Sequence, residues 1–216
     1  MIVDLIHRQC ELIFTEPKSP VLNSTGVFYM IVGIDYSLTS PAICVFTGGK
    51  YSKFQYEKCK FYFLTDTKKY AQTWDDQIFG TRFSDYHCES QRYSTIADWA
   101  TEHCMGASSI ALEGYAYNAK GASAFQLAEN MGIFKYKLFE LSLPLDVVAP
   151  TEVKKFATGK GNSDKPAMHA EFMKATKVNL KNKITPDKSG VSNPVSDIVD
   201  AYFICRWLHS KMNSVR

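Results

Sequence analysis

Several features that would place the chain in a specialised class are missing from it. None of its six cysteines forms a Cys-x-x-Cys pair, and no Cys/His group has the spacing of a zinc finger. No apolar run approaches the roughly 20 residues that a membrane span needs. The N-terminal "MIVDLIHRQCELIF" contains acidic residues, which are untypical of a secretory signal. We therefore expect reduced thiols, a soluble intracellular protein and no membrane partner.

A strong excess of charge of either sign is also missing. Lys and Arg number 25 and Asp and Glu number 22, which gives a net charge of +3. The chain of 216 residues is 45% hydrophobic, enough for one domain with a substantial core, and its composition excludes a disordered or fibrous protein. Any basic binding surface must therefore be local.

Composition divides the chain into an extension and a domain. Residues 1–28 contain "TEPKSPVLNSTG", which is typical of a linker, so we predict an N-terminal extension followed by a domain over residues 29–216. Short apolar or alternating runs predict five strands. They are "MIVGID", "AICVF", "FQYEKCKFYFL", "SSIALE" and "PLDVVAP".

Helical periodicity predicts the remaining elements. One helix is expected over Cys88–Met105, one in "ASAFQLAENMGIFKYKLFEL", one after Thr151 as a candidate cap, one in "KPAMHAEFMKAT" and a last one in "SDIVDAYFICRWLHSKM". Residues 66–83 are predicted as a loop or short helix, and the lysine-rich "NLKNKITPDKSGVSNPV" is predicted as a loop. Strands that alternate with helices favour an α/β domain with a mixed, five-stranded sheet flanked by helices.

Four acidic residues stand at the ends of these predicted elements. Asp35 ends the first strand, Glu113 ends "SSIALE", and Asp197 and Asp200 share a face on the first turns of the last helix. Active sites of open α/β sheets lie at the carboxyl ends of strands, so we expect the four carboxylates to meet there.

Carboxylates that meet in this way repel one another, and a hard divalent cation removes the repulsion. Two Mg²⁺ ions, which Mn²⁺ could replace, would suit in-line phosphoryl transfer. Each acid also has a structural explanation: Asp197 alone is more often a helix cap than a ligand, and Asp35 alone could be a turn residue. The prediction depends on all four occurring together.

With the four acids placed, the sequence resembles RuvC-type Holliday-junction resolvases of the RNase H-like superfamily. The resemblance rests on "GIDYSLTSPAICVF", "LEGYAYNAKGASAFQLAENMG", "VAPTEVKKFATGKGNSDK" and "SDIVDAYFICRWL", and it covers about residues 30–210. It implies an RNase H-like fold and a metal-dependent endonuclease that cuts four-way junctions in pairs, with other branched DNA as further substrates. Asp35, Glu113, Asp197 and Asp200 would hold the metal, and Lys165 would join them in catalysis.

The departures from the family indicate a divergent member, viral or otherwise, in the cytoplasm of a bacterium or of an infected host cell. The stretch from Asp35 to Glu113 is longer than in bacterial members, and residues 1–28 are extra. The family's base-stacking aromatic falls near Ala116, which is not aromatic.

Two local segments are predicted to contact DNA. Residues 150–190 hold nine lysines against four acidic residues, and glycines near them allow close approach to phosphates. Beyond the catalytic strand, aromatic and polar residues could hold an unpaired base. The predicted contacts are Lys154, Lys155, Lys160, Lys165, Tyr115, Tyr117, Asn118 and Lys120. A solvated lysine face and ordinary core tyrosines remain the alternatives.

The helix after Tyr117 is predicted to form a homodimer. It carries small residues (Ala122, Ala124, Ala128 and Gly132), and in the family this helix builds the two-fold interface. A four-way junction is itself two-fold symmetric and needs two symmetric cuts.

Three alternative functions would each require a different set of residues. A non-catalytic nucleic-acid-binding protein on a degenerate nuclease fold would not need all four acids. An actin-like ATPase would need a second glycine-rich phosphate loop, and a proofreading exonuclease would carry Asp-x-Glu on its first strand, where this chain has "DYS".

Overall fold

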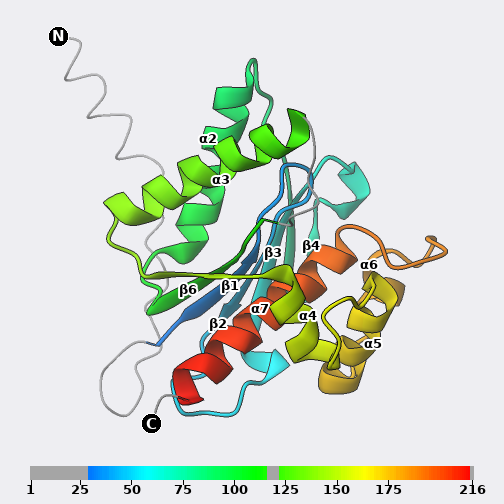
Figure 1. Cartoon of the computed structure of the whole chain (residues 1–216). Helices are drawn as coiled ribbons and strands as arrows, with labels where there is room; N and C mark the ends of the chain where they lie inside the picture. Colours follow the sequence, from blue (N-terminus) through cyan, green and yellow to red (C-terminus); the bar gives the residue numbers. More distant parts are fainter. Residues whose placement is uncertain (1–28, 116–121, 215–216) are drawn as a thin grey trace.

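A seven-stranded mixed sheet forms the centre of the computed structural model, which describes residues 29–115 and 122–214 (Figure 1). Its order is β4-β5-β3-β2-β1-β6-β7. The strands are β1 (Ile31–Asp35), β2 (Ala42–Phe46), β3 (Cys59–Thr65), β4 (Thr73–Trp74), β5 (Ile78–Arg82), β6 (Ser109–Glu113) and β7 (Leu145–Val148).

The centre of this sheet joins an antiparallel meander to a parallel half. Strand β1 runs antiparallel to β2, and β2 runs antiparallel to β3. On the other side, β1 is parallel to β6, and β6 is parallel to β7. The carboxyl ends of β1 and β6 therefore lie side by side at one edge, as expected for the two strands that end in Asp35 and Glu113.

The prediction of five strands was wrong in number. Residues 66–83, predicted as a loop or short helix, contain the turn η2 (Lys68–Tyr70) and the added strands β4 and β5. Strands β4 and β5 were not predicted because their polar and aromatic residues do not alternate regularly. Strand β5 pairs in parallel with β3, so the extra hairpin extends the far edge of the sheet.

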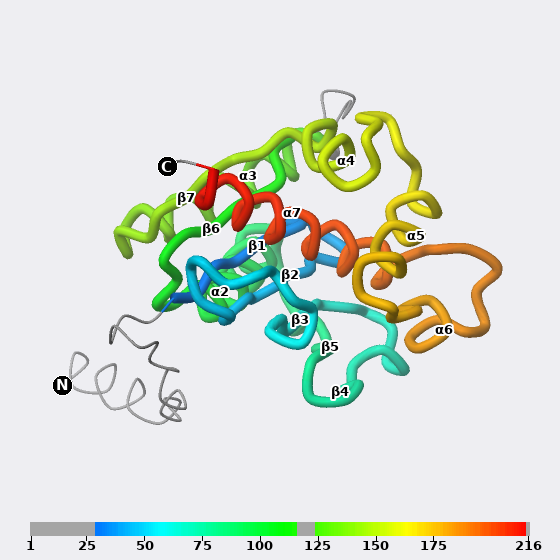
Figure 2. Tube along the Cα trace, turned by 90° about the horizontal axis from the view of Figure 1, so that it is seen from below, coloured from blue at the N-terminus to red at the C-terminus, as the bar shows by residue number. Residues whose placement is uncertain are grey.

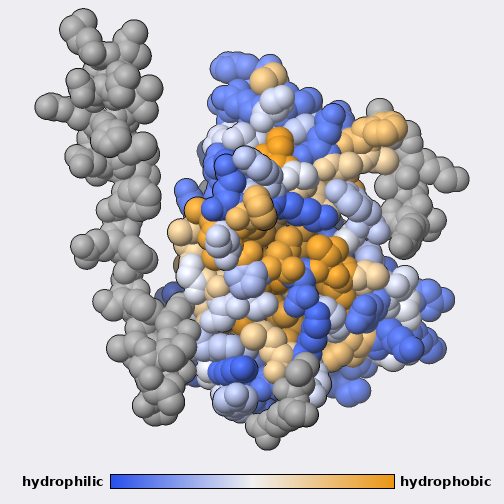
Figure 3. All heavy atoms as spheres, turned by 60° about the vertical axis from the view of Figure 1, so that its left-hand side comes forward, coloured by the Kyte–Doolittle hydropathy of each residue, from blue (hydrophilic) through white to orange (hydrophobic). Residues whose placement is uncertain are grey.

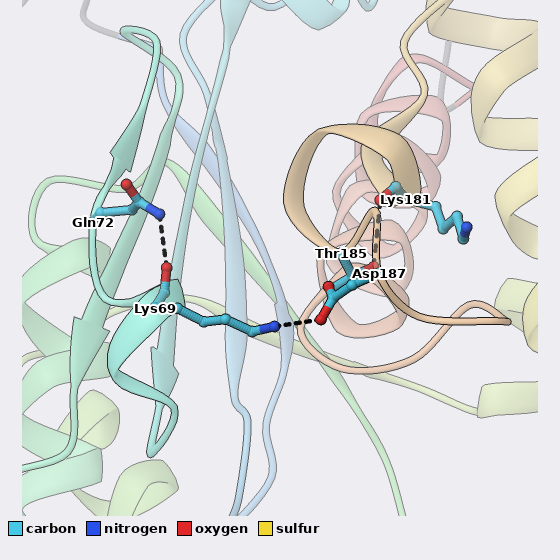
Figure 4. A network of polar contacts seen from close by, with 5 residues as sticks. All are labelled: Lys69, Gln72, Lys181, Thr185 and Asp187. Atoms are coloured by element: carbon cyan, nitrogen blue, oxygen red, sulfur yellow. Dashed lines mark hydrogen bonds and ion pairs between the residues drawn. The ribbon is translucent and has the colours of Figure 1, made fainter.

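Ion pairs attach this added hairpin region to the lysine-rich segment near the C-terminus. Lys69 Nζ lies 2.6 Å from Asp187 Oδ2, while the Gln72 amide donates to the Lys69 carbonyl (Figure 4). Lys183 also pairs with Asp75. Segments more than 100 residues apart in sequence thus meet at the same edge of the fold.

Helices cover both faces of the sheet (Figures 1 and 2). Helices α2 and α3 pack on one face and α4 to α7 on the other, as the two clusters of buried hydrophobic residues show. The helices are α2 (Glu89–Cys104), α3 (Ala122–Glu140), α4 (Pro150–Thr158), α5 (Lys165–Thr176), α6 (Leu180–Ile184) and α7 (Val195–Ser214), and η1 (Tyr56–Lys58) is a further short turn. Within the described ranges, no helix is long and apolar enough to cross a membrane.

Two local predictions about helices need correction. Helix α4 begins at Pro150 with Ala149 as its N-cap, so Thr151 is not the cap. Proline suits this first position because its fixed φ is helical and its missing N–H is not needed there. The lysine-rich segment predicted as a loop contains the short helix α6, whose start is capped by the Asn179 side chain.

Alternation along β1 directs successive side chains to opposite faces of the sheet. Val32 and Ile34 pack with α2 and α3, whereas Ile31 packs on the side of α7. Asp35 has the parity of Ile31, so it is directed toward α7, and Tyr36 returns to the side of α3. The last helix and the first strand can therefore combine their acidic residues.

Candidate active site

The four acidic residues are brought together at one edge of the sheet. The parallel register that pairs Ile34 with Leu112 places Asp35 beside Glu113. Asp197 and Asp200 approach from the first turns of α7, and their charges act on the Asp35 carboxyl. Asp197 is buried, while the other three retain partial access to solvent.

Burial and mutual repulsion raise the pKa values of all four carboxyl groups. For Asp35 the pKa is well above its usual range because of burial and then the charge of Glu113. Burial, followed by the charge of Asp200, raises the pKa of Glu113 to about 7, and burial with Asp197 raises the pKa of Asp200 to about 7. Such a cluster disfavours its own ionised state until a positive charge compensates it.

Asp197 has its own set of hydroxyl neighbours. Burial raises its pKa, and the hydroxyls of Ser40 and Ser196, with the charge of Lys165, act in the opposite direction. Ser196 Oγ lies 2.9 Å from Asp197 Oδ1. The second oxygen, Oδ2, is buried and has no hydrogen-bond partner within the described residues.

The chemistry of this donor set fits a hard cation. Buried carboxylates, with one oxygen left unpartnered, are the ligands that Mg²⁺ and Mn²⁺ prefer. The four acids do not form a preformed metal centre: across residues 29–115 and 122–214, no three His, Cys, Asp or Glu side chains lie close enough to hold an ion as they stand. Bound water or small side-chain rotations would have to complete the coordination.

Two predicted basic residues lie next to the carboxylates. The charge of Lys154 opposes the rise in pKa of both Glu113 and Asp200. Together with Lys165 and Asp200, Lys154 lines a small cavity of about 80 Å³ between α4, α5 and α7. The short α4–α5 connection places one lysine before the glycine break and the other after it, so both reach the same edge.

Lys165 has contacts that the sequence did not predict. Its Nζ donates to Asn193 Oδ1 and Ser196 Oγ, both at 3.1 Å. Lys165 opens α5 directly after its N-cap, Asp164, whose carboxylate accepts a hydrogen bond from the Ala167 N–H. Lys165 is thus tied to the residues before Asp197 and remains exposed to a ligand.

The other predicted DNA contacts are less closely attached to this edge. Lys155 and Lys160 are exposed on α4 and on the turn after it. Tyr115 is 42% exposed just after β6, with Lys135 Nζ 5.1 Å from its ring centroid. Tyr117, Asn118 and Lys120 lie outside the described residues.

Several neighbours of the acids were not predicted from the sequence. Ser40, Asn193 and Ser196 contact or influence Asp197 and Lys165, and Tyr36 follows Asp35 directly. Ser196 could have been found by its position just before Asp197. Asn193 also precedes Asp197 closely and accepts a hydrogen bond from Ser196 Oγ, so it could have been found in the same way. Ser40 could not, because only the tertiary fold brings it to this edge.

The architecture defines an RNase H-like α/β fold, in which a central first strand pairs with β2 on one side and β6 on the other. No family model matches the sequence, and no curated protein matches it. Among solved structures, RuvC of Thermus thermophilus aligns at 14% identity with a TM-score of 0.53, covering 85% of this chain and 96% of that chain.

The same bacterial protein in complex with a Holliday junction substrate aligns with a TM-score of 0.55 at 14% identity, covering 85% and 97% of the two chains. The fowlpox virus resolvase in complex with Holliday junction DNA covers 86% of this chain and 99% of its own at 15% identity, with a TM-score of 0.45. The two alignments with the bacterial RuvC protein confirm the expected resemblance to RuvC-type resolvases at the level of the fold.

Proposed function

We propose that the protein is a metal-dependent DNA endonuclease that resolves four-way junctions by paired phosphodiester hydrolysis, with other branched DNA as further substrates. The observation that carries this proposal is the buried, mutually repelling set Asp35, Glu113, Asp197 and Asp200 at the carboxyl ends of β1 and β6. Such a set is costly for stability unless a cation binds it, so its presence supports a metal-dependent role.

Each part of the edge has a distinct role in this proposal. The four carboxylates would hold two Mg²⁺ ions, or Mn²⁺ in their place; when bound, such ions supply an activated water and neutralise the leaving oxygen. Lys165 would bind the phosphate that is cut, held in place by Asn193 and Ser196. Lys165 is therefore proposed as a catalytic residue.

The DNA would approach across the basic residues that surround the acids. We propose that Lys154, Lys155 and Lys160 bind phosphates along α4 and the turn after it, which fixes the register of the strand but reads no sequence. We propose that Tyr115 stacks on an unpaired base, and its exposure just after β6 supports this role. The same role is proposed for the segment with Tyr117, Asn118 and Lys120.

A homodimer through α3 is supported by a stripe of exposed aromatic and small residues along this helix, of which the sequence pattern indicated only the small ones. Phe125 is 73%, Tyr136 59% and Phe139 78% exposed, and Ala128 and Gly132 are exposed between them. At 100° per residue the five positions fall in a stripe about 80° wide. Hydrophobic side chains also gather broadly on the face shown in Figure 3.

The stripe is arranged symmetrically about Gly132. Phe125 and Phe139 lie seven residues to either side of it, and Ala128 and Tyr136 lie four residues to either side. Two copies of α3 crossing antiparallel at Gly132 would therefore pair Phe125 with the other copy's Phe139. A two-fold contact of this kind is closed and self-complementary. It would present two active sites to one junction.

Cleavage of a labelled four-way junction, compared with a linear duplex of the same sequence, tests the proposed function. We expect Mg²⁺-dependent paired cuts in the junction, none in EDTA, and little cutting of the duplex. Asp200→Asn should bind the junction without cutting it. The control variant Asp146→Asn, which changes an acidic residue of β7 that pairs with Lys211, should cut normally. Binding without metal-dependent cleavage by the wild type would instead identify a non-catalytic binding protein.

The domain boundaries that we propose follow from the limits of the first strand and the last helix. Residues 29–216 would form the nuclease domain, because β1 begins at Ile31 and α7 ends at Ser214 within it. Residues 1–28 would be an extension outside that domain. They lie outside the described part of the chain.

A further inference from the structure

Tyr36 follows Asp35 directly but points to the opposite face of the sheet. It is buried, with 4% of its surface exposed, in the cluster formed with α2 and α3. Its ring stacks on Phe134 of α3, with centroids 4.7 Å apart and planes 14° apart. Its hydroxyl donates to Asn130 Oδ1 at 3.2 Å. The residue after Asp35 is thus held by two contacts with one helix.

Asn130 is an unusual residue for this location. It is fully buried on the inner face of α3, and its Nδ2 has no hydrogen-bond partner in the described part of the chain. Burying an amide is unfavourable unless its polar atoms are used. Among the described residues, the Asn130 side chain accepts one hydrogen bond, from the Tyr36 hydroxyl, and this contact indicates that the amide orients the tyrosine.

The rest of the β1–β2 connection is also fixed from the helix side. Arg92 of α2 donates to the Leu38 carbonyl at 2.9 Å, and the Ser40 N–H donates to Ser37 Oγ at 3.0 Å. The connection begins at Asp35 and ends near Asp197, whose pKa the Ser40 hydroxyl influences. Helices α2 and α3 carry none of the four acids, yet they hold the segment that leads from Asp35 to the neighbourhood of Asp197.

We infer that Tyr36 is a positioning residue, whose stack on Phe134 and hydrogen bond to Asn130 fix the backbone at Asp35 and so the direction of its carboxylate. This inference rests on the proposed function for its catalytic consequence. Because α3 is also the proposed dimer helix, the same contacts connect the dimer interface to the acidic edge. The direction of a metal ligand matters, because replacing a residue that orients such a ligand typically lowers metal affinity or activity by about 10- to 100-fold.

Tyr36→Phe is the test variant, because it keeps the stacking ring and removes only the hydroxyl. Tyr56→Phe is the matched control: Tyr56 is also buried and packs on the other face of the sheet, and its hydroxyl has no hydrogen-bond partner among the described residues. Three measurements are made on each protein. They are Mn²⁺ affinity by calorimetry, junction affinity in Ca²⁺, and the single-turnover cleavage rate at saturating enzyme and Mn²⁺.

For Tyr36→Phe we expect Mn²⁺ affinity to fall by about 10-fold and the cleavage rate by a similar factor, with junction affinity unchanged. Tyr56→Phe should match the wild type in all three. The double variant Tyr36→Phe/Asn130→Leu should bind Mn²⁺ no more weakly than Tyr36→Phe alone, because the two residues act as one unit.

Two results would overturn the inference. One is a Tyr36→Phe protein with a lower melting temperature but wild-type Mn²⁺ affinity and rate, which would make Tyr36 a packing residue only. The other is an equal loss of Mn²⁺ affinity in Tyr56→Phe. If the wild type binds Mn²⁺ but cuts no junction, the proposed function fails, whereas a selective loss of Mn²⁺ affinity in Tyr36→Phe still supports the inference.

Discussion

A Cβ atom on Gly33 would stand 2.2 Å from the backbone nitrogen of Cys205. Helix α7 therefore lies directly on β1, closer than any residue with a side chain at position 33 would allow. This close packing carries the first turns of α7 to the carboxyl end of β1. The absence of a side chain at Gly33 is thus a condition for bringing Asp197 and Asp200 to Asp35.

Gly33→Ala should consequently destabilise the protein by at least about 2 kcal/mol, because backbone atoms of α7 cannot move aside as a flexible side chain could. Urea unfolding measures the change. Gly190→Ala is the control, since nothing lies within 4 Å of the added Cβ there, and we expect a change within about 0.5 kcal/mol. Equal stability of the two variants would contradict the close packing.

Asp200→Asn should abolish cleavage and yet stabilise the metal-free protein. Burial and the charge of Asp197 oppose ionisation of Asp200, so removing its charge relieves repulsion, by on the order of 1 kcal/mol or more at pH 8. Thermal unfolding in EDTA measures this gain. The rise in melting temperature on adding Mn²⁺ should be smaller than in the wild type. A less stable metal-free variant would count against a repelling carboxylate cluster.

Lys165→Ala should lower the single-turnover rate on a junction by on the order of 100-fold at saturating enzyme, because Asn193 and Ser196 hold its ammonium group next to the acids, where we propose that it binds the phosphate that is cut. Lys154→Ala should mainly weaken DNA binding, and the slope of log affinity against log salt concentration should fall in magnitude by about one. Lys53→Ala serves as the control for general charge loss, because Lys53 is exposed in the β2–β3 connection, at the end of the sheet opposite the four acids. An unchanged rate for Lys165→Ala would reduce this lysine to a binding contact.

Phe139→Asp should convert the protein from a dimer to a monomer, because the charge would be buried against the other copy's Phe125 at the proposed axis. Light scattering at several concentrations measures the mass. Phe156→Asp is the matched control, since Phe156 is an exposed phenylalanine of α4, away from the stripe. Wild-type protein that is monomeric and still makes paired cuts would refute the dimer.

His103 predicts an acid-sensitive contribution to stability. It stacks on Tyr62 at 3.9 Å between centroids, and burial lowers its pKa from 6.5 to about 4. The unfolded chain thus binds a proton between pH 6.5 and 4 that the folded chain does not, so this stability is present above pH 6.5 and is lost as the pH falls toward 4. The loss between pH 7 and 5 is about 2 kcal/mol.

The comparison that isolates this residue is the difference between wild type and His103→Phe at each pH. Phenylalanine keeps the stack and removes the titrating group, so the wild type should lose more stability than the variant between pH 7 and 5. Urea unfolding at four or five pH values provides the data. Parallel profiles would show that His103 is not protonated selectively in the unfolded state.

Local sequence patterns determined most of the central fold. The apolar runs of β1, β2 and β6 and the helical periods of α2 and α7 fall where they were predicted, because each element buries one continuous face. The positions of Asp35 and Glu113 at strand ends followed from those runs. Strands β4 and β5 did not, since their residues lack alternation and pair only because β3 offers a free edge.

What only the tertiary structure decided is how the acids are surrounded. Ser40, Asn193 and Tyr36 acquire their contacts from segments 28 to 157 residues away in sequence, and no local pattern encodes such distances. The stripe on α3 likewise became visible only when burial of Phe134 and Leu138 showed which face was left exposed. Residue types and spacing determined which chemistry the chain could carry, whereas packing across the sheet decided which groups orient it.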